Sequence, residues 1–578
     1  MSPATVLSPV SAYIWETKYR FGTTEASVED TWRRVARALA SVETSNRNGW
    51  EKRFFETLAD FRFLPGGRIL AGAGTGRRVT LFNCFVMGAI EDSMEGIFNA
   101  LKEGAITMQQ GGGVGYDFST LRPRGAAAQS VGTVATGPVS FMHIWDSMCA
   151  TIVASGARRG AMMGVLRCDH PDIEEFIEAK RDPTRLRHFN LSVLVTDAFM
   201  QAVLADADWP LVFPPDQDQH QYQVVKARAL WQRILRAAYD CAEPGVIFID
   251  RVNQWNNLWY CERISATNPC GEIPLPPYGA CDLGSINLVR FVREPFTPNA
   301  RMDFTAIEEV VTVATRMLDN VHDLSHFPLQ RQAEVAHESR RLGLGITGLA
   351  DALIMLGIRY GEPPSFDMAA QIMWTVRAAA YGASIELARH KGVFPRFVAE
   401  DYLESRFIRE LPLDLRAGIK RHGLRNSHLT AIAPAGTISL LANNVSSGLE
   451  PVFRLCYSRR FRRVDGGFET REVTDYAHRL FEAQFGAGMP LTDAFVTVAQ
   501  VPPEAHLEMQ ARLQGLVDNA ISKTINLPVE TDFAAFQSLF ERAYSAGLKG
   551  CTAFRPNPVT GEILLSHSVT PDEPCCPC

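Results

Sequence analysis

The stretch ALWQRILRAAYDCAEPGVIFID, residues 229–250, contains two different hydrophobic patterns in succession. Its first part spaces apolar residues as one face of a helix does, and its end, GVIFID, is a short apolar run typical of a buried strand. The same alternation recurs elsewhere, because HPDIEEFIEAKRD (170–182) has a helical pattern, whereas LSVLVTD (191–197) and HLTAIAP (428–434) have strand patterns. Helices that alternate with apolar strands predict an α/β protein with a largely parallel sheet.

The overall composition is that of a folded globular protein with a large core. The 578 residues are 46% hydrophobic and carry a formal net charge of −6. No basic patch or polybasic run indicates a nucleic-acid or membrane-surface partner. The N-terminus, MSPATVLSPVSAYIWETKYR, lacks a secretory pattern, and no segment approaches the roughly 20 apolar residues that span a bilayer. We therefore expect a cytoplasmic protein with no nucleic-acid or membrane partner.

Three parts of the chain differ in character. Residues 1–60 carry apolar side chains at helical spacing among charges and predict a small helical region. Residues 61–555 alternate glycine-rich stretches with strands and helices and form the predicted main body. Residues 556–578 are rich in proline, lack an amphipathic period and end in thiols. This last composition predicts a flexible tail.

The segment NPCGEIPLPPYGAC, residues 268–281, combines two cysteines, an amide and a carboxylate with four prolines that argue against a helix. If the segment is extended, Asn268, Cys270 and Glu272 share one face, because side chains alternate along a strand. A converging amide, thiol and carboxylate suit proton and hydrogen-atom chemistry at a hydroxylated substrate. A solvated proline-rich turn with an incidental cysteine explains the same residues equally well.

The twelve cysteines raise the question of disulfides and metals. A static disulfide framework is not expected in a reducing compartment, and most free cysteines are small core residues. Cys261, Cys270 and Cys281 lack the paired C-x2-C spacing of structural zinc, so we predict no metal site. The terminal pair Cys575 and Cys578 suits thiol–disulfide exchange, because a tail can move between two partners.

Two glycine-rich stretches lie within the main body. GLGITG (343–348) matches the dinucleotide fingerprint, but the charged, helical EVAHESRRLG (334–343) precedes it where a buried strand is required. We therefore expect these glycines to permit close packing of a central strand. GGGVG (111–115) is expected to be a loop without a phosphate-binding pattern.

Two further stretches have features of anion-binding loops. PAGTIS (434–439) follows a predicted strand and presents backbone N–H groups and hydroxyls, as a phosphate site or an ordinary capped turn would. SGARRG (155–160) places two arginines in a glycine-bounded loop, which fits nucleotide contact or a solvated turn.

Taken in order, these motifs resemble the catalytic chain of ribonucleotide reductases. The matching motifs are FNCF (82–85), SGARRGAMMGVL (155–166), NPCGE (268–272), LGLGITGLAD (342–351), PAGTIS (434–439), SKTINLP (522–528) and KGCTAFRPN (549–557). The resemblance covers nearly the whole chain, and in detail it is similar to the adenosylcobalamin-dependent class II enzymes. It implies a ten-stranded α/β barrel with an interior finger loop, a small N-terminal helical region and a flexible C-terminal tail.

The resemblance implies a role for each residue of the finger loop. Cys270 would hold the thiyl radical that takes the ribose 3′-hydrogen. Glu272 would accept the 3′-hydroxyl proton, and Asn268 would bind the substrate hydroxyls.

The resemblance also implies two redox pairs. Cys84 and Cys281, 197 positions apart in the sequence, would deliver two electrons and protonate the departing 2′-hydroxyl. The tail thiols, most simply Cys575 and Cys578, would reduce that pair again. Thioredoxin or glutaredoxin would then recycle the tail, with Cys576 as an extra thiol whose part is open.

Binding residues and assembly follow from the same resemblance. The implied substrate contacts are Asn83 and the loop residues Ala435, Gly436, Thr437, Ile438 and Ser439. A deoxynucleotide or ATP effector at a specificity site would be bound near Asp92, Arg122, Ser155, Gly156, Arg158 and Arg159. A homodimer is expected.

The chain departs from other reductases in two places. The stretch before Phe63 is too short for an ATP-binding cone, so no overall-activity site is expected. KGCTAFRP (549–556) lacks the tyrosine pair of class I large subunits, which favours adenosylcobalamin as the local source of the radical. The predicted activity is therefore cobalamin-dependent reduction of ribonucleotides, with diphosphates favoured over triphosphates.

Three alternatives remain at this point. The first is a class I-like large subunit that needs a separate radical-generating subunit. The second is a non-catalytic nucleotide-binding regulator on the same fold, and the third is a redox carrier that uses only the terminal thiols.

Overall fold

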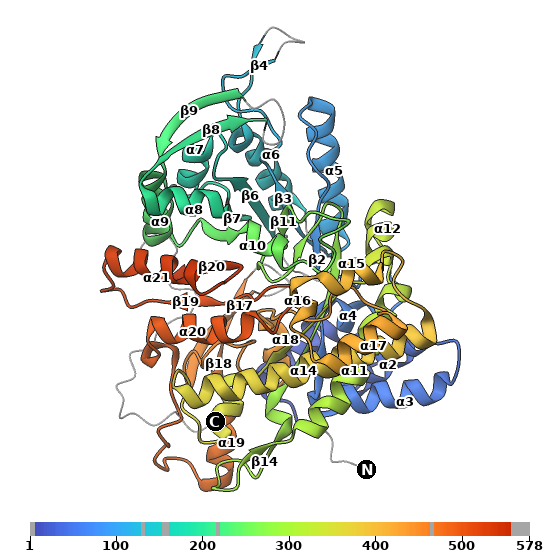
Figure 1. Cartoon of the computed structure of the whole chain (residues 1–578). Helices are drawn as coiled ribbons and strands as arrows, with labels where there is room; N and C mark the ends of the chain where they lie inside the picture. Colours follow the sequence, from blue (N-terminus) through green and yellow to red (C-terminus); the bar gives the residue numbers. More distant parts are fainter. Residues whose placement is uncertain (1–5, 129–132, 153–160, 215–219, 463–466, 557–578) are drawn as a thin grey trace.

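The computed structural model describes residues 6–128, 133–152, 161–214, 220–462 and 467–556 (Figure 1). Several residues with predicted roles lie outside these ranges: Ser155, Gly156, Arg158, Arg159, Cys575 and Cys578.

The first half of the central sheet is built from five parallel strands. They are β2 (Cys84–Val86), β3 (Gly113–Asp117), β6 (Met162–Arg167), β7 (Phe189–Val195) and β10 (Gly245–Phe248), each paired with the next. Parallel neighbours require crossover connections, which here contain α5 (Met94–Gln109), α6 (Pro138–Thr151), α7 (Ile173–Glu178), α8 (Asp197–Ala205) and α9 (Ala227–Cys241).

The second half runs in the opposite direction. Its strands are β13 (Ala280–Asn287), β16 (Leu342–Thr347), β19 (Thr524–Asn526) and β20 (Gly550–Phe554). β13 pairs in parallel with β16, and β19 with β20. Two isolated parallel bridges, Leu344 with Thr430 and Ile432 with Ile521, connect these pairs. The segment 428–434, predicted as a strand, therefore takes part only through single bridges.

The two halves meet twice, and the sheet closes. β10 pairs antiparallel with β20, and β2 pairs antiparallel with β13. The ten-stranded sheet also includes β1 (Phe63–Pro65), which pairs with β13. The predicted α/β barrel is confirmed, because the strand pairings run from β2 through both halves and back to β2.

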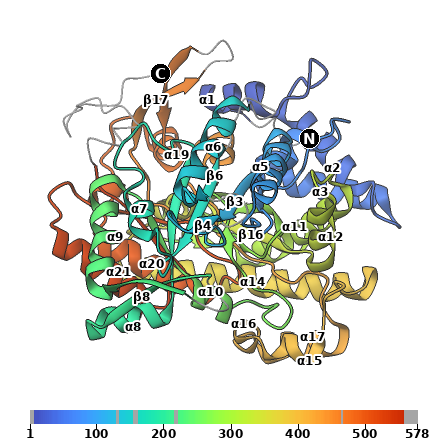
Figure 2. The same ribbon diagram turned by 90° about the horizontal axis from the view of Figure 1, so that it is seen from above.

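Helices surround this barrel. Figure 2, a view from above, shows them around the central strands β3, β6 and β16. The helices of the second half and the C-terminal part are α10 (Ile249–Gln254), α11 (Phe304–Leu324), α12 (Gln330–Ser339), α13 (Leu349–Met355), α14 (Pro363–Lys391), α15 (Ala399–Glu404), α16 (Arg406–Arg409), α17 (Leu413–His422), α18 (Gly436–Leu441), α19 (Tyr476–Phe485), α20 (Pro503–Gln514) and α21 (Phe533–Ser545). Antiparallel hairpins outside the barrel are β4–β5 (Ala127–Ala128, Thr133–Val134), β8–β9 (Asp208–Phe213, His220–Lys226), β14–β15 (Val292–Arg293, Arg301–Met302) and β17–β18 (Cys456–Arg462, Phe468–Thr474).

The N-terminal residues form helices, as predicted. These are α1 (Pro9–Ile14), α2 (Val28–Ala40) and α3 (Arg47–Leu58), and a further short helix, α4 (Gly67–Gly72), follows β1 outside the predicted region. Helix α2 starts with a capping box between Ser27 and Asp30 and buries an apolar stripe. The buried Glu43 that follows it accepts two hydrogen bonds from Arg316 of α11, which ties the helical region to the barrel.

A short hairpin lies inside the barrel. Its strands are β11 (Ala266–Thr267) and β12 (Pro274–Leu275), and we call residues 266–275 the finger hairpin. Its apolar side chains belong to a separate interior cluster: Cys84, Val86, Met163, Val165, Leu194, Ala266, Ile273, Leu275, Cys281, Leu283 and Ala431. The finger hairpin therefore packs on inward-facing side chains of both halves.

Glycines allow the finger hairpin to fit. A Cβ atom on Gly115 of β3 would lie 1.9 Å from the carbonyl oxygen of Thr267, so only glycine permits this approach. The prediction of a loop over GGGVG is therefore wrong for Gly113–Gly115, which belong to a strand under the finger hairpin. GLGITG contributes to β16 as predicted, and a Cβ on Gly345 would lie 2.1 Å from the carbonyl oxygen of Ala431.

Within the described residues, no helix combines the length and apolar character needed to cross a membrane.

Replacing Gly345 by alanine should destabilise the barrel. The added Cβ would force β16 away from segment 430–432 at the point where single bridges connect the strands. We expect a loss of about 2 kcal/mol or more in the free energy of unfolding, measured by denaturant titration. The control is Gly515→Ala, where an added Cβ meets nothing within 4 Å. Equal stability of the two variants would contradict this account of barrel closure.

Candidate active site

The tip of the finger hairpin is a tight turn, Asn268–Ile273. Gly271 has a φ of +85°, and its N–H donates to the carbonyl of Asn268 at 3.1 Å. The side-chain oxygen of Asn268 accepts the N–H of Ile273 at 2.9 Å, which closes the turn. The prediction of an extended segment is therefore wrong here, because the Asn268 amide and a left-handed glycine bend the chain.

The turn nevertheless places Asn268 and Glu272 together. Both side chains are buried, each 2% exposed, whereas Cys270 between them is exposed. The Asn268 amide donates to Cys84 Sγ at 3.2 Å, and Glu272 Oε1 lies 4.0 Å from the same sulfur. An amide, a carboxylate and a thiol thus meet below the tip.

Cys84 and Cys281 lie opposite each other. In the antiparallel register of β2 and β13 they are direct partners, although 197 positions separate them. Directly opposed residues have Cβ atoms about 4.5–5.5 Å apart, close to the spacing of a disulfide. Burial raises the pKa of the Cys281 thiol well above its usual range, so this thiol keeps its proton until chemistry removes it.

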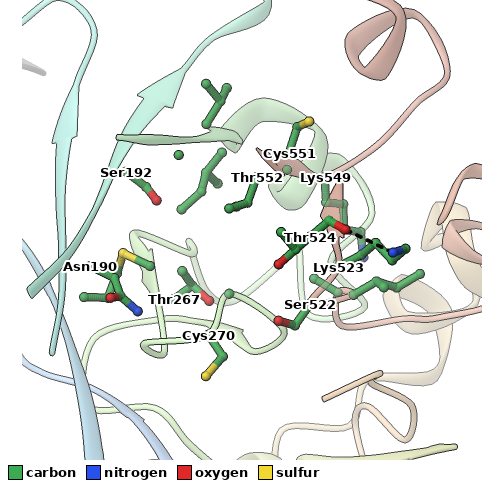
Figure 3. Close-up of a pocket in the computed structure, with 18 of the residues that line it drawn as sticks. Asn190, Ser192, Thr267, Cys270, Ser522, Lys523, Thr524, Lys549, Cys551 and Thr552 are labelled. Carbon is green, nitrogen blue, oxygen red and sulfur yellow. Dashed lines mark hydrogen bonds between the residues drawn. The ribbon is translucent and has the colours of Figure 1, made fainter. Parts of the chain in front are cut away.

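A cavity of about 300 Å³ adjoins the finger tip (Figure 3). It is lined from the finger by Pro269, Cys270 and Gly271. The barrel strands and the residues just before them contribute, among others, Asn190, Ser192, Gly245, Ser522, Lys523, Thr524, Lys549, Gly550, Cys551 and Thr552. In Figure 3 the Cys270 side chain leaves the loop on the side away from Lys523 and Lys549. Cys270 is itself part of the lining of this cavity.

Two lysines at the cavity are held by the barrel. Lys549 donates to the carbonyls of Asp518, at 2.6 Å, and Asn519, and burial lowers its pKa to about 7. Lys523 donates to Glu450 and, at 2.7 Å, to His506 Nδ1. Because His506 accepts this bond, its ring is neutral, and burial next to Lys523 lowers its pKa.

The predicted phosphate loop begins a short helix. Ala435 has a φ of +52° and precedes α18, whose first residues Gly436 and Thr437 are exposed. Ile438 and Ser439 are buried, and the Ser439 hydroxyl donates to the Gly436 carbonyl at 3.1 Å and lies 3.0 Å from the Ser447 hydroxyl. The exposed N-terminal turn can face an anion, whereas Ser439 supports the turn from within.

The other predicted contacts are only partly brought together. Asn83 precedes β2, and its side-chain oxygen is buried without a hydrogen-bond partner among the described residues. Arg122 Nε donates to Asp92 Oδ2 at 2.7 Å, so these two effector-site candidates form an ion pair beside α5. The remaining specificity-loop residues and the tail thiols lie outside the described residues.

Three supporting contacts are not evident from motifs. Asn190 Nδ2 donates to the Pro269 carbonyl at 2.7 Å, Thr267 Oγ1 donates to Asn268 Oδ1 at 3.2 Å, and the Ala520 N–H donates to the Glu272 carbonyl at 2.9 Å. Asn190 and Ser192 stand two residues apart on β7 and both line the cavity. Side chains alternate between the two faces of a strand, so the sequence pattern of β7 could have placed these two residues on the same face.

Among the described residues, no group of three or more His, Cys, Asp or Glu side chains is placed to hold a metal ion.

Comparison with protein families gives two adjoining matches. The model of the ribonucleotide reductase barrel domain matches residues 82–554, and that of the ribonucleotide reductase all-alpha domain matches residues 5–78. The chain belongs to the ribonucleotide reductase family. Its similarity to a vitamin B12-dependent ribonucleoside-diphosphate reductase of Mycobacterium tuberculosis is 38% identity over 93% of this chain and 77% of the relative. A Thermoplasma acidophilum protein of the same name is 34% identical over 98% of this chain and 73% of the relative.

The large subunit of a vaccinia virus ribonucleoside-diphosphate reductase is more distant. It is 25% identical over 89% of this chain and 73% of its own length. Similarity is therefore greater to these B12-dependent reductases than to this large subunit.

The register of this reductase predicts a disulfide between Cys84 and Cys281. Mild oxidation of the reduced protein with diamide should link these two cysteines, as peptide mapping by mass spectrometry would show. Cys168 is also fully buried but lies just after β6, outside its pairing register, and serves as the control. Recovery of Cys84 and Cys281 only in separate, unlinked peptides would contradict the register.

Proposed function

We propose that this chain reduces ribonucleoside diphosphates to 2′-deoxyribonucleotides in an adenosylcobalamin-dependent reaction. Its substrate is a ribonucleotide, as in the family to which it belongs. The observation that carries the proposal is the opposed pair of Cys84 and Cys281 below a finger tip that bears Asn268, Cys270 and Glu272. The B12-dependent relatives support both the activity and the cofactor.

The residues beside Cys270 fit a nucleoside-bearing cofactor. Hydroxyl and amide groups of Asn190, Ser192, Ser522 and Thr552 line the cavity. A Cβ on Gly245 would lie 3.0 Å from Ser192 Oγ and 3.3 Å from Thr552 Oγ1, so glycine keeps this space open. These residues would hold the adenosyl part of adenosylcobalamin, which when bound supplies the one-electron oxidising power that makes a thiyl radical at Cys270.

The finger residues then act on the ribose. The Cys270 sulfur takes the hydrogen atom from C3′ and returns it at the end of the reaction. Glu272 accepts the 3′-hydroxyl proton, and Asn268 positions the hydroxyls. Glu272 is buried, which keeps this proton transfer away from bulk solvent.

Cys84 and Cys281 supply the electrons. One thiol protonates the 2′-hydroxyl, which leaves as water. The two sulfurs then form a disulfide and deliver two electrons to the ribose, so each deoxynucleotide is balanced by one disulfide and one water. Their opposed positions allow this bond to form without movement of the strands.

Regulation and recycling complete the proposal. Cys575 and Cys578 would reduce the Cys84–Cys281 disulfide and be recycled by thioredoxin or glutaredoxin. Asp92 and Arg122, with the loop Ser155–Gly160, would bind a deoxynucleotide or ATP effector across a homodimer. The three parts of the chain, 1–60, 61–555 and 556–578, would then be a helical region, a catalytic barrel and a redox tail.

A class I-like large subunit is less well supported. Such a subunit relays a radical through a tyrosine pair. Here Gly550 and Thr552 of β20 line the cavity, and the described residues that line it include no tyrosine. A regulator without activity would not require the Cys84–Cys281 pair.

Activity should depend on cobalamin and on Cys270. The purified protein with a ribonucleoside diphosphate, dithiothreitol and adenosylcobalamin should form deoxynucleotide, measured by chromatography. Cys270→Ser should lower the rate by at least about 10³-fold because no other group can take the 3′-hydrogen. Product that appears only after addition of a second metalloprotein would overturn the assignment of the cofactor.

Replacing a tail thiol should lower turnover with thioredoxin but not with dithiothreitol. Cys578→Ser should abolish turnover driven by thioredoxin and leave turnover driven by dithiothreitol within about twofold, because a small dithiol reaches the interior disulfide directly. Steady-state assays with each reductant make the comparison, with Cys261→Ser as the control for an exposed cysteine. Equal losses with both reductants would exclude the tail as the carrier.

A further inference from the structure

Two buried carboxyl groups meet behind the predicted phosphate loop. Asp351 lies in the first turn of α13 and Asp475 is the N-cap of α19. Their exposed fractions are 0% and 3%. Successive N–H groups at the start of α19 bring the two carboxyls together, because Ala477 donates to Asp351 at 2.8 Å and His478 donates to Asp475 at 3.1 Å. We call these residues the carboxyl pair.

Asp351 connects three segments of the chain. Its Oδ2 accepts the N–H of Ser446 at 2.5 Å, and its Oδ1 accepts the N–H of Ala477 at 2.8 Å. The Ser446 hydroxyl in turn accepts the N–H of Ala350 at 3.1 Å. This carboxylate therefore fixes the loop around Ser446 between α13 and α19.

The loop around Ser446 supports the phosphate loop. The Ser446 carbonyl accepts bonds from Gly348 N–H at 2.7 Å and Thr347 Oγ1 at 2.9 Å, which attaches it to the end of β16. The next residue, Ser447, contacts the hydroxyl of Ser439, which holds the Gly436 carbonyl. Because α18 has only six residues, it is too short to be stable by itself and depends on such contacts.

The geometry of the carboxyl pair favours a single proton shared between the two groups. Two carboxyls in contact cannot both ionise, and burial together with the neighbouring carboxylate raises the pKa of Asp475 well above its usual range. Asp351 accepts two N–H groups and Asp475 accepts one, so the geometry favours the proton on Asp475, from which it can be donated to Asp351.

Other titratable groups near the pair lie on β17 and α19. Burial raises the pKa of Tyr457 on β17, with a smaller contribution from Asp475, while Arg459 of the same strand opposes the rise. The N–H of His478 donates to Asp475 Oδ1 at 3.1 Å, while its ring lies 3.9 Å from Glu482.

We propose that Asp351 and Asp475 are positioning residues for the substrate's phosphate groups: their shared proton holds Ser446 and Ser447 and, through Ser439, the first turn of α18. The inference rests on the proposed function, because it takes Ala435–Ser439 as the site that binds the diphosphate. Neither carboxyl touches the substrate.

The sign of the pH effect follows from this arrangement. As pH rises through the pKa of Asp475, the shared proton is lost and two negative charges face each other in a buried site. The carboxyls separate, Ser446 shifts, and the phosphate loop loses its support. The KM for a ribonucleoside diphosphate should therefore rise with pH by up to about tenfold per pH unit, while kcat stays nearly constant.

The test compares three variants of the holoenzyme. Asp475→Asn keeps both hydrogen bonds, because its amide donates to Asp351 and its oxygen accepts the His478 N–H, but it cannot lose a proton. Its KM should stay flat over the pH range in which the wild-type KM rises. Asp351→Asn has only one acceptor oxygen for two N–H groups, and its KM at neutral pH should rise about tenfold or more with kcat within about threefold. Asp532→Asn, an exposed N-cap of α21 whose carboxylate accepts the Ala535 N–H, is the control and should match the wild type.

Calorimetric binding of ADP or CDP over the same pH range gives a second readout that does not require turnover. A KM for Asp475→Asn that follows the wild-type pH profile would overturn the inference, as would a loss confined to kcat in Asp351→Asn. If only the proposed function is wrong, the outcome differs. The wild-type protein would then still bind ADP or CDP with the pH dependence given above, but no deoxynucleotide would form.

Discussion

The antiparallel pairing of β2 with β13 is the constraint on which the active site depends. It closes one seam of the barrel and in the same step sets Cys84 opposite Cys281. A register shift of one residue would turn one of the two thiols away from the barrel interior. The finger hairpin packs on these same strands, so the position of Asn268 and Glu272 at Cys84 follows from the same register.

Glycine positions allow the rest of the interior to close. At Gly115 and Gly345 another segment's backbone comes so close that any side chain would collide with it. Gly115 lies under the finger hairpin, and Gly345 lies beside segment 430–432, which is joined to the barrel by single bridges. The barrel interior is therefore filled partly by its own finger hairpin. The space left over forms the cavity beside Cys270.

Much of this could be predicted from the sequence, for reasons that differ between elements. Alternating patterns gave the α/β class, since α9 and β10 follow the periodicity of residues 229–250. Local pattern failed at the finger tip, where Asn268 and Gly271 form a turn, and at GGGVG, where the need for glycine comes from a segment about 150 positions away. The opposition of Cys84 and Cys281 came from family resemblance alone, because spacing of 197 residues carries no geometric information.

For the proposed phosphate loop, too, the sequence reveals the motif but not the residues that hold it in place. PAGTIS is visible as a motif, whereas the carboxyl pair that underlies it is split between residues 351 and 475 and has no local signature. Buried polar contacts of this kind connect segments that only the fold brings together. In the proposed account they add to the buried side chains Ile438, Leu440 and Leu441 in holding the short helix α18.

The central claim is that Cys84 and Cys281 supply the two electrons for each product. The most direct measurement uses a variant in which Cys575, Cys576 and Cys578 are replaced by serine, reduced beforehand and given ribonucleoside diphosphate and adenosylcobalamin without any external reductant. The account predicts one deoxynucleotide per chain, with a Cys84–Cys281 disulfide formed in equal amount. Deoxynucleotide formed while both cysteines remain as free thiols would contradict it.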